Sequence, residues 1–142
     1  MVTYTKSKRV VLGHSPSKGY EPYFGAVSSS SSRRLDVLFH DWRDQALGAN
    51  VWWRSEDRDL PDMSHLTEVL DETECEIVVA LGLLVADLLV KDPQMLETYE
   101  VDRDGRTLRV LVFPHPSGLN RFWNDYHNRV RAADLLKEIL LS

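Results

Sequence analysis

Short apolar runs, separated by proline, glycine and polar residues, divide the chain into strand-like and helix-like segments. Four runs are short and rich in β-branched or aromatic residues, and they predict strands over residues 8–13, 49–53, 76–82 and 107–113. The third run is apolar on both faces and ends in Gly82, which is typical of a parallel strand buried on both sides. An Asp-Arg-Asp-Gly turn at residues 102–105 predicts a hairpin-like approach from residues 99–101 to the last strand.

Apolar positions at helical spacing predict helices between these strands. The first helix enters through the serine run at residues 28–32, where a serine can cap it, and ends near Gly48, which suits a C-terminal cap. Further helices are predicted over residues 64–74 and 83–90, and a C-terminal helix over residues 122–140 is expected to pack on the sheet. Strands that alternate with helices indicate an α/β domain with a mainly parallel sheet.

Composition supports one globular domain, residues 1–142, because 43% of the residues are hydrophobic and 27% are charged. Cys75 is the only cysteine, which excludes an internal disulfide and a multi-cysteine zinc or iron–sulfur site within one chain. We expect Cys75 to be a small buried hydrophobe beside a strand. No run approaches 18 uninterrupted apolar residues and residues 1–11 lack a signal-peptide core, so we expect a cytoplasmic protein with no membrane span.

The net charge of −5 argues against nucleic-acid binding through global electrostatics alone. Local basic groups remain, among them Arg33 and Arg34, and further along the chain Arg121, Arg129 and Arg131. The simplest interpretation of each group alone is a solvated face.

The most distinctive loop follows the last predicted strand. The apolar residues 110–113 are followed by Pro114 and Pro116. These prolines end the hydrogen bonding of the strand to its neighbours, because proline has no N–H to donate. The same loop carries five residues of interest: His115, the hydroxyl of Ser117, Gly118, the apolar Leu119 and the amide of Asn120. Loops at the carboxyl ends of strands are where open α/β sheets bind ligands, and residues 13–25 and Asn50 are expected at this same edge.

These loops resemble the motifs of the uracil-DNA glycosylase superfamily. The sequence Gly-His-Ser-Pro at residues 13–16, followed by Phe24-Gly25, is similar to its first motif. Residues 77–82 with Ala86 are similar to its central strand and following helix, and His-Pro-Ser-Gly-Leu-Asn at residues 115–120 is similar to its most specific motif. The resemblance covers most of the chain, from about Lys8 to the C-terminal helix. It implies a three-layer α/β/α sandwich around a four-stranded parallel sheet.

The resemblance implies a base-binding site and, with it, roles for individual residues. Phe24 would stack on the extruded base, Asn50 would read the uracil edge, and His115 would stabilise negative charge on the leaving base. Considered singly, each has a structural alternative: Phe24 as edge packing, Asn50 as a turn or strand-end cap, and His115 as a loop histidine satisfied by backbone.

The same loop is implied to contact DNA. Ser117 would bind a phosphate, and Leu119 would fill the gap that the flipped nucleotide leaves, with Asn120 and Arg121 beside them. Alone, Ser117 could cap the final helix, and an exposed leucine needs no explanation. The implied partner is DNA, single- or double-stranded, with uracil or a modified base. We expect no metal, no cofactor and no membrane, and a monomer by default.

The first motif departs from the pattern at Ser15. In the best-known branch an aspartate that activates water stands at this position, and serine is not a base near pH 7. His14, with an ordinary pKa of about 6.5, is the nearest candidate base. Ser17 stands where that branch has a tyrosine that excludes thymine, so a roomier pocket is expected.

Two functions follow from these residues. The first is a monofunctional DNA N-glycosylase that acts on a flipped uracil or modified base. The alternative is a catalytically degenerate module of the same fold, which binds nucleic acid, a nucleotide or a protein without chemistry. A glycosidase of free nucleotides or of a hypermodified base is a more remote option.

Overall fold

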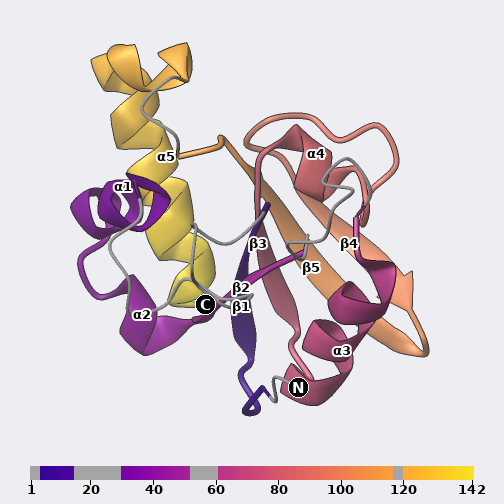
Figure 1. Ribbon diagram of the computed structural model, residues 1–142. Coiled ribbons are helices and arrows are strands. Elements are labelled where there is room, and N and C mark those ends of the chain that lie inside the picture. Colours follow the sequence, from indigo (N-terminus) through magenta and orange to yellow (C-terminus); the bar gives the residue numbers. More distant parts are fainter. Residues whose placement is uncertain (1–3, 15–29, 52–60, 117–119) are drawn as a thin grey trace.

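A five-stranded sheet lies between two layers of helices (Figure 1). The computed structural model describes residues 4–14, 30–51, 61–116 and 120–142. The strands, in the spatial order β2-β1-β3-β5-β4, are β1 (Arg9–Gly13), β2 (Leu47–Asn50), β3 (Ile77–Leu81), β4 (Thr98–Arg103) and β5 (Arg106–Phe113).

The sheet is parallel except at one edge. β1 pairs in parallel with β2 and β3, and β3 pairs in parallel with β5. β4 is antiparallel to β5 across the turn at Asp104 and Gly105. The predicted α/β class with a mainly parallel sheet is therefore confirmed, although the sheet has five strands rather than the four expected. The extra strand is the predicted hairpin segment, whose alternating partly buried and exposed residues fit an edge strand.

Helices cover both faces of the sheet. On one side lie α1 (Ser30–Leu38), α2 (Trp42–Gln45) and α5 (Tyr126–Leu140), and on the other lie α3 (Met63–Thr73) and α4 (Leu83–Ala86) (Figure 1). Each face has its own apolar core, because β3 is buried on both sides: Val79 packs toward α5, and Val78 and Ala80 pack toward α3. This arrangement is the predicted three-layer sandwich.

The prediction for residues 33–48 was wrong in detail. The expected single helix ends at Leu38, a turn leads to α2, and Gly48 lies inside β2 rather than at a helix cap. Asp36 explains the break, because its carboxylate accepts a hydrogen bond from Trp42 Nε1 at 2.9 Å across the turn and also binds Arg43. Trp42 is fully buried, so the turn delivers its ring to the core.

The C-terminal helix also differs from its predicted face. It begins at Tyr126, after the short 3-10 helix η1 (Arg121–Asn124), and Asp125 caps it through the His127 N–H. Tyr126 and Val130 are exposed, whereas Leu136 and Leu140 are buried against the sheet. Only the later turns of the predicted apolar stripe therefore form core.

Two further expectations concern Cys75 and membranes. Cys75 is buried directly before β3, as predicted, and burial raises the pKa of its thiol. Within the described ranges, none of the helices combines the length and the apolar character needed to cross a membrane.

Candidate functional site

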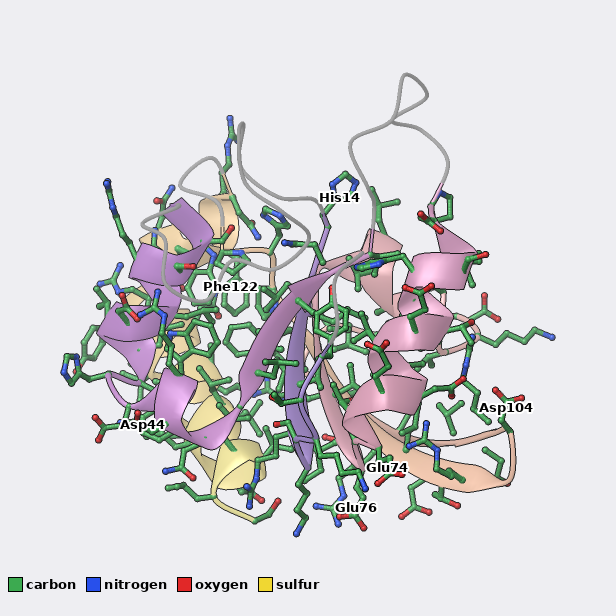
Figure 2. The ribbon with its side chains drawn as sticks, turned by 60° about the horizontal axis from the view of Figure 1, so that its bottom comes forward. His14, Asp44, Glu74, Glu76, Asp104 and Phe122 are labelled. Carbon is green, nitrogen blue, oxygen red and sulfur yellow. The ribbon has the colours of Figure 1, made fainter. Side chains whose placement is uncertain are left out.

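The carboxyl ends of β1, β2, β3 and β5 meet at one edge of the sheet, because these four strands are parallel. His14 stands at this edge in Figure 2, opposite Glu76 and the turn at Asp104. His14, Asn50 and His115 each follow or end one of these strands. The edge therefore brings together three residues that were predicted from separate parts of the sequence.

Asn50 is the last residue of β2 and is almost fully buried, with 1% of its surface exposed. It pairs in register with Gly13, and the Val51 N–H donates to the Gly13 carbonyl at 3.0 Å. Ala49 and Val51 belong to the core on the α3 side, so strand alternation directs Asn50 to the opposite face, beside a glycine that has no side chain. This register gives the amide a fixed position at the strand end.

The Asn50 amide nitrogen has an unused hydrogen-bonding capacity. Nδ2 is buried, and no acceptor among the described residues lies within hydrogen-bond distance of it. A buried donor without a partner costs about 1–3 kcal/mol, so folded proteins rarely keep one without a reason. Such a group, fixed on a strand at a ligand-binding edge, is suited to recognising a polar ligand.

His115 lies two residues beyond β5 in a loop whose two ends are tied together. Its carbonyl accepts hydrogen bonds from Trp123 Nε1 at 2.9 Å and from Asn120 Nδ2 at 3.0 Å. Asn120 Oδ1 in turn accepts from the Phe122 N–H at 3.1 Å, which caps η1. The 3-10 helix therefore fixes the backbone at the point where the imidazole leaves it.

Gly82 lies against the His115 side chain. It follows β3, has a φ of +97°, and donates its N–H to the Phe113 carbonyl at 2.7 Å. A Cβ at this position would lie 3.4 Å from His115 Cβ and 3.5 Å from His115 Cδ2. These are ordinary van der Waals distances, so the positive φ is what favours glycine here, because other residues adopt this backbone conformation only with strain.

The two histidines at this edge are both neutral near pH 7. Burial lowers the pKa of His115. Burial also lowers the pKa of His14, and the positive charge that His115 would carry lowers it further, which means that the two rings sense each other. A neutral imidazole has one N–H donor and one ring nitrogen that accepts, so each ring can either donate to or accept from a bound group.

The remaining predicted residues divide into two groups. The Asn120 side chain is engaged within its own loop, and Arg121 is exposed on η1. Ser15, Phe24, Ser117 and Leu119, like Ser17, lie outside the described residues, so their implied roles stay predictions. In the part of the chain that is described, no group of three or more histidine, cysteine or acidic side chains is arranged to hold a metal ion.

Sequence reasoning missed Trp123 and the role of Gly82. Trp123 is buried and joins the His115 loop to the core, with its ring tilted against Phe113 at 5.9 Å between centroids. The available signal was Asn120, a capping residue two positions before the aromatic pair at residues 122–123.

The chain matches no protein-family model and no curated protein sequence. Its function therefore has to be inferred from chemistry. The edge combines a buried amide, whose Nδ2 has no acceptor among the described residues, with two neutral imidazoles. One of them, that of His115, projects from a backbone held by two hydrogen bonds. Such a set can bind a polar, uncharged ring with carbonyl and N–H groups, and it can stabilise negative charge that develops on a carbonyl oxygen.

Proposed function

We propose that this protein is a DNA N-glycosylase, similar to the uracil-DNA glycosylase superfamily, that releases a flipped uracil or modified base. The observation that carries the proposal is the buried Asn50 amide, whose Nδ2 has no acceptor among the described residues, at the same sheet edge as His14 and His115. An amide offers a donor and an acceptor side by side, which matches the carbonyl and N–H groups on the edge of uracil.

His115 has the properties needed to assist departure of the base. When water adds to C1′ and the N-glycosidic bond breaks, the bonding electrons leave with the base, and negative charge develops on its carbonyl oxygen. A neutral imidazole can donate its one N–H to that oxygen, and it needs a fixed orientation to do so. The hydrogen bonds of Trp123 and Asn120 to the His115 carbonyl hold the backbone from which the ring projects, which supports such an orientation.

His14 is the candidate acceptor for the proton that the attacking water loses. Its lowered pKa keeps the ring neutral and able to accept at pH 7, but it also makes the ring a weaker base than an ordinary histidine. We therefore expect a slow enzyme. The cytoplasmic location expected from the sequence remains a prediction.

The weakness of that base favours a second candidate function, which is binding without chemistry. In this alternative, Asn50 and the two histidines hold a base or nucleotide at the sheet edge, and no bond is broken. The two functions predict the same ligand contacts and differ only in the product.

Excision from oligonucleotides of known sequence tests the proposal. Single- and double-stranded oligonucleotides with uracil, hypoxanthine, xanthine or a 5-substituted pyrimidine are incubated with the protein, and abasic sites are cleaved with alkali. We expect cleavage with at least one substrate. Loss of one donor to the leaving group should slow excision about a hundredfold in His115→Ala, and Asn50→Asp should be impaired similarly.

The exposed His40 provides a matched control, since His40→Ala removes the same side chain far from the proposed chemistry. Circular dichroism of each variant shows whether it is folded. Absence of cleavage on every substrate contradicts the enzymatic proposal. Binding of the same oligonucleotides, weakened by Asn50→Asp, then supports the second candidate, whereas detection of a released free base excludes it.

A further inference from the structure

We infer that five arginines beside the candidate site form a surface for the phosphate backbone of the DNA strand that carries the target base. We call them the arginine surface: Arg33, Arg34, Arg121, Arg129 and Arg131. The inference deepens the proposed function and rests on it for the identity of the partner as DNA. The family resemblance implied a DNA contact for Arg121 only, so the other four are newly assigned.

The arginine surface lies at the same edge of the sheet as the candidate site. Arg33 and Arg34 lie in the first half of α1, Arg121 opens η1, and Arg129 and Arg131 lie in the first two turns of α5. α5 follows the carboxyl end of β5 and α1 runs toward β2, so both helices begin near this edge. The two helices pack against each other, and they are side by side in Figure 1.

Trp123 joins the arginine surface to the His115 loop. The Arg34 guanidinium lies 5.1 Å from the centre of the Trp123 ring, and Arg129 Nη1 donates to the Trp123 carbonyl at 2.7 Å. The same residue donates its indole N–H to the His115 carbonyl. Two of the arginines are therefore held by the residue that also fixes His115, so a strand that fills the site passes next to them.

The charges of this surface are not neutralised by carboxylates among the described residues. Among the described residues, none of the five arginines forms an ion pair with a carboxylate, whereas Arg43 and Arg106 are paired with Asp36 and Asp71. Residues 30–36 and 120–134 contain these five arginines and three aspartates. Of the aspartates, Asp36 binds Arg43, and Asp125 caps α5.

A local positive surface is what an acidic protein needs in order to bind DNA. With a net charge of −5, the chain as a whole repels phosphates, so attraction has to come from a segregated group of cations. The group consists of arginine without lysine, and a guanidinium can bind a phosphate with two parallel N–H groups. Stacking on Trp123 leaves the edge of the Arg34 guanidinium free to make such contacts.

The test measures DNA binding separately from excision. The double variant Arg33→Gln/Arg131→Gln removes two exposed charges whose side chains contribute no hydrogen bond or ion pair among the described residues, and so should fold normally. Arg103→Gln/Arg109→Gln is the control for charge, because it removes the same charge toward the opposite edge of the sheet. Arg103 donates to Thr67 Oγ1 at 3.4 Å, so circular dichroism is used to check that this variant is folded. Fluorescence anisotropy with an undamaged and a uracil-containing oligonucleotide, from 50 to 300 mM salt, gives the affinity and its salt dependence.

We expect the Arg33/Arg131 variant to bind both oligonucleotides about tenfold more weakly at low salt, and the control variant to bind like the wild type. The slope of log affinity against log salt should fall by about 1–2, because each lost phosphate contact releases fewer counterions. Excision at saturating DNA should be unchanged, since neither residue belongs to the base site.

Failure of this inference is distinguishable from failure of the proposed function. If the Arg33/Arg131 variant binds DNA like the wild type, with the same salt slope, the arginine surface is not a DNA surface, even where uracil is excised. If the wild type excises no base but its DNA binding depends on these arginines, the surface stands and the glycosylase proposal falls. Wild-type protein that binds no DNA at 50 mM salt overturns the inference and leaves an acidic protein as the candidate partner.

Discussion

His14 and His115 determine how the proposed activity should respond to pH. Burial lowers the pKa of both rings, and each ring acts in its neutral form, His115 as a donor and His14 as an acceptor. The neutral forms persist below the ordinary histidine pKa of about 6.5, so we expect single-turnover excision to stay constant from pH 8 to about 6.5. It should fall only at lower pH, as the lowered pKa values are reached.

Single-turnover rates at saturating DNA between pH 5 and 8 check this expectation, with His40→Ala as a control that should give the wild-type profile. A rate that rises as the pH falls through 6.5 contradicts it, because such a profile requires a protonated imidazole. The profile therefore reports which form of His115 stabilises the leaving base.

Gly82 and Gly105 form a natural pair for testing how His115 is positioned. Both have a positive φ, +97° and +79°, but only at Gly82 would a Cβ lie within 4 Å of His115, whereas at Gly105 it would meet open space. Alanine at either position strains the backbone, which should lower the free energy of unfolding by about 1–2 kcal/mol. Only Gly82→Ala should also place a methyl group in van der Waals contact with the His115 ring and so alter the pKa of that ring.

Urea unfolding measures the first effect, and the pKa of His115 from NMR of its ring protons measures the second. In Gly105→Ala the His115 pKa should equal that of the wild type. An unchanged His115 pKa in Gly82→Ala would mean that the glycine serves the backbone alone. This test needs no substrate and stands apart from the glycosylase proposal.

At the scale of elements, η1 is what connects the base site with the arginine surface. Trp123→Phe keeps an aromatic ring beneath Arg34 but removes the N–H that binds the His115 carbonyl. We expect a loss of about 1 kcal/mol of unfolding free energy, slower excision and unchanged DNA affinity. The loss of rate follows because the loop that orients His115 keeps only the Asn120 bond.

Trp42→Phe is the matched control for this element. It also removes one indole hydrogen bond of 2.9 Å, to Asp36 in the turn between α1 and α2. A similar loss of stability with normal excision is expected there. Equal excision by both variants would show that the Trp123 hydrogen bond serves stability and does not position His115.

The elements differ in how far the sequence predicts them. β3 and α3 were predicted closely, because apolar residues on both strand faces or at helical spacing are decided by local pattern and burial together. The break between α1 and α2 depends on Asp36 reaching Trp42, six residues away, and hydrophobic spacing contains no information on such a hydrogen bond. Tyr126 and Val130 continue the helical period but face solvent. The sequence pattern did not predict this exposure, because periodicity does not tell where the sheet ends.

For the candidate site, the sequence predicted which sheet edge it occupies but not its hydrogen bonds. His115 was predicted because prolines end the last strand at the edge where ligands bind. Asn50, which lay inside the strand predicted over residues 49–53, was predicted from the family resemblance. Asn50 Nδ2 lacks an acceptor among the described residues, and Trp123 binds the His115 carbonyl. Both features depend on distances between strands and loops, which one sequence does not specify. The roles implied for Ser15, Phe24, Ser117 and Leu119 remain predictions, since these residues lie outside the described ranges.

For the whole molecule, a third histidine with a lowered pKa, this one buried, joins the start of the chain to α3. The Tyr4 hydroxyl and His65 Nε2 form a hydrogen bond of 2.8 Å, and the Tyr4 N–H donates to Glu72 at 2.9 Å. Burial lowers the pKa of His65, although Asp62, Glu68 and Glu72 offset part of that effect. His65 is thus the only one of the three histidines with a lowered pKa that lies away from the proposed site, packed between α3 and the segment before β1.

These three histidines make the stability of the protein depend on pH. Because His14, His65 and His115 have lower pKa values in the folded than in the unfolded chain, the unfolded chain binds more protons below pH 6.5. Their contribution is therefore complete above about pH 6.5 and is lost as the pH falls through the folded pKa values. We expect the urea midpoint to be lower at pH 5.5 than at pH 7.5.

Substitution of single histidines measures how much each one contributes to the pH dependence of the urea midpoint. His65→Gln should lower the midpoint at pH 7.5, because the bond to Tyr4 is altered, and should also reduce the difference between pH 7.5 and pH 5.5. The exposed His40→Gln should leave both unchanged. A midpoint that stays constant or rises toward pH 5.5 in the wild type would mean that the buried histidines accept protons in the folded state as easily as in water. The neutral His115 required for the proposed chemistry would then lose its physical basis.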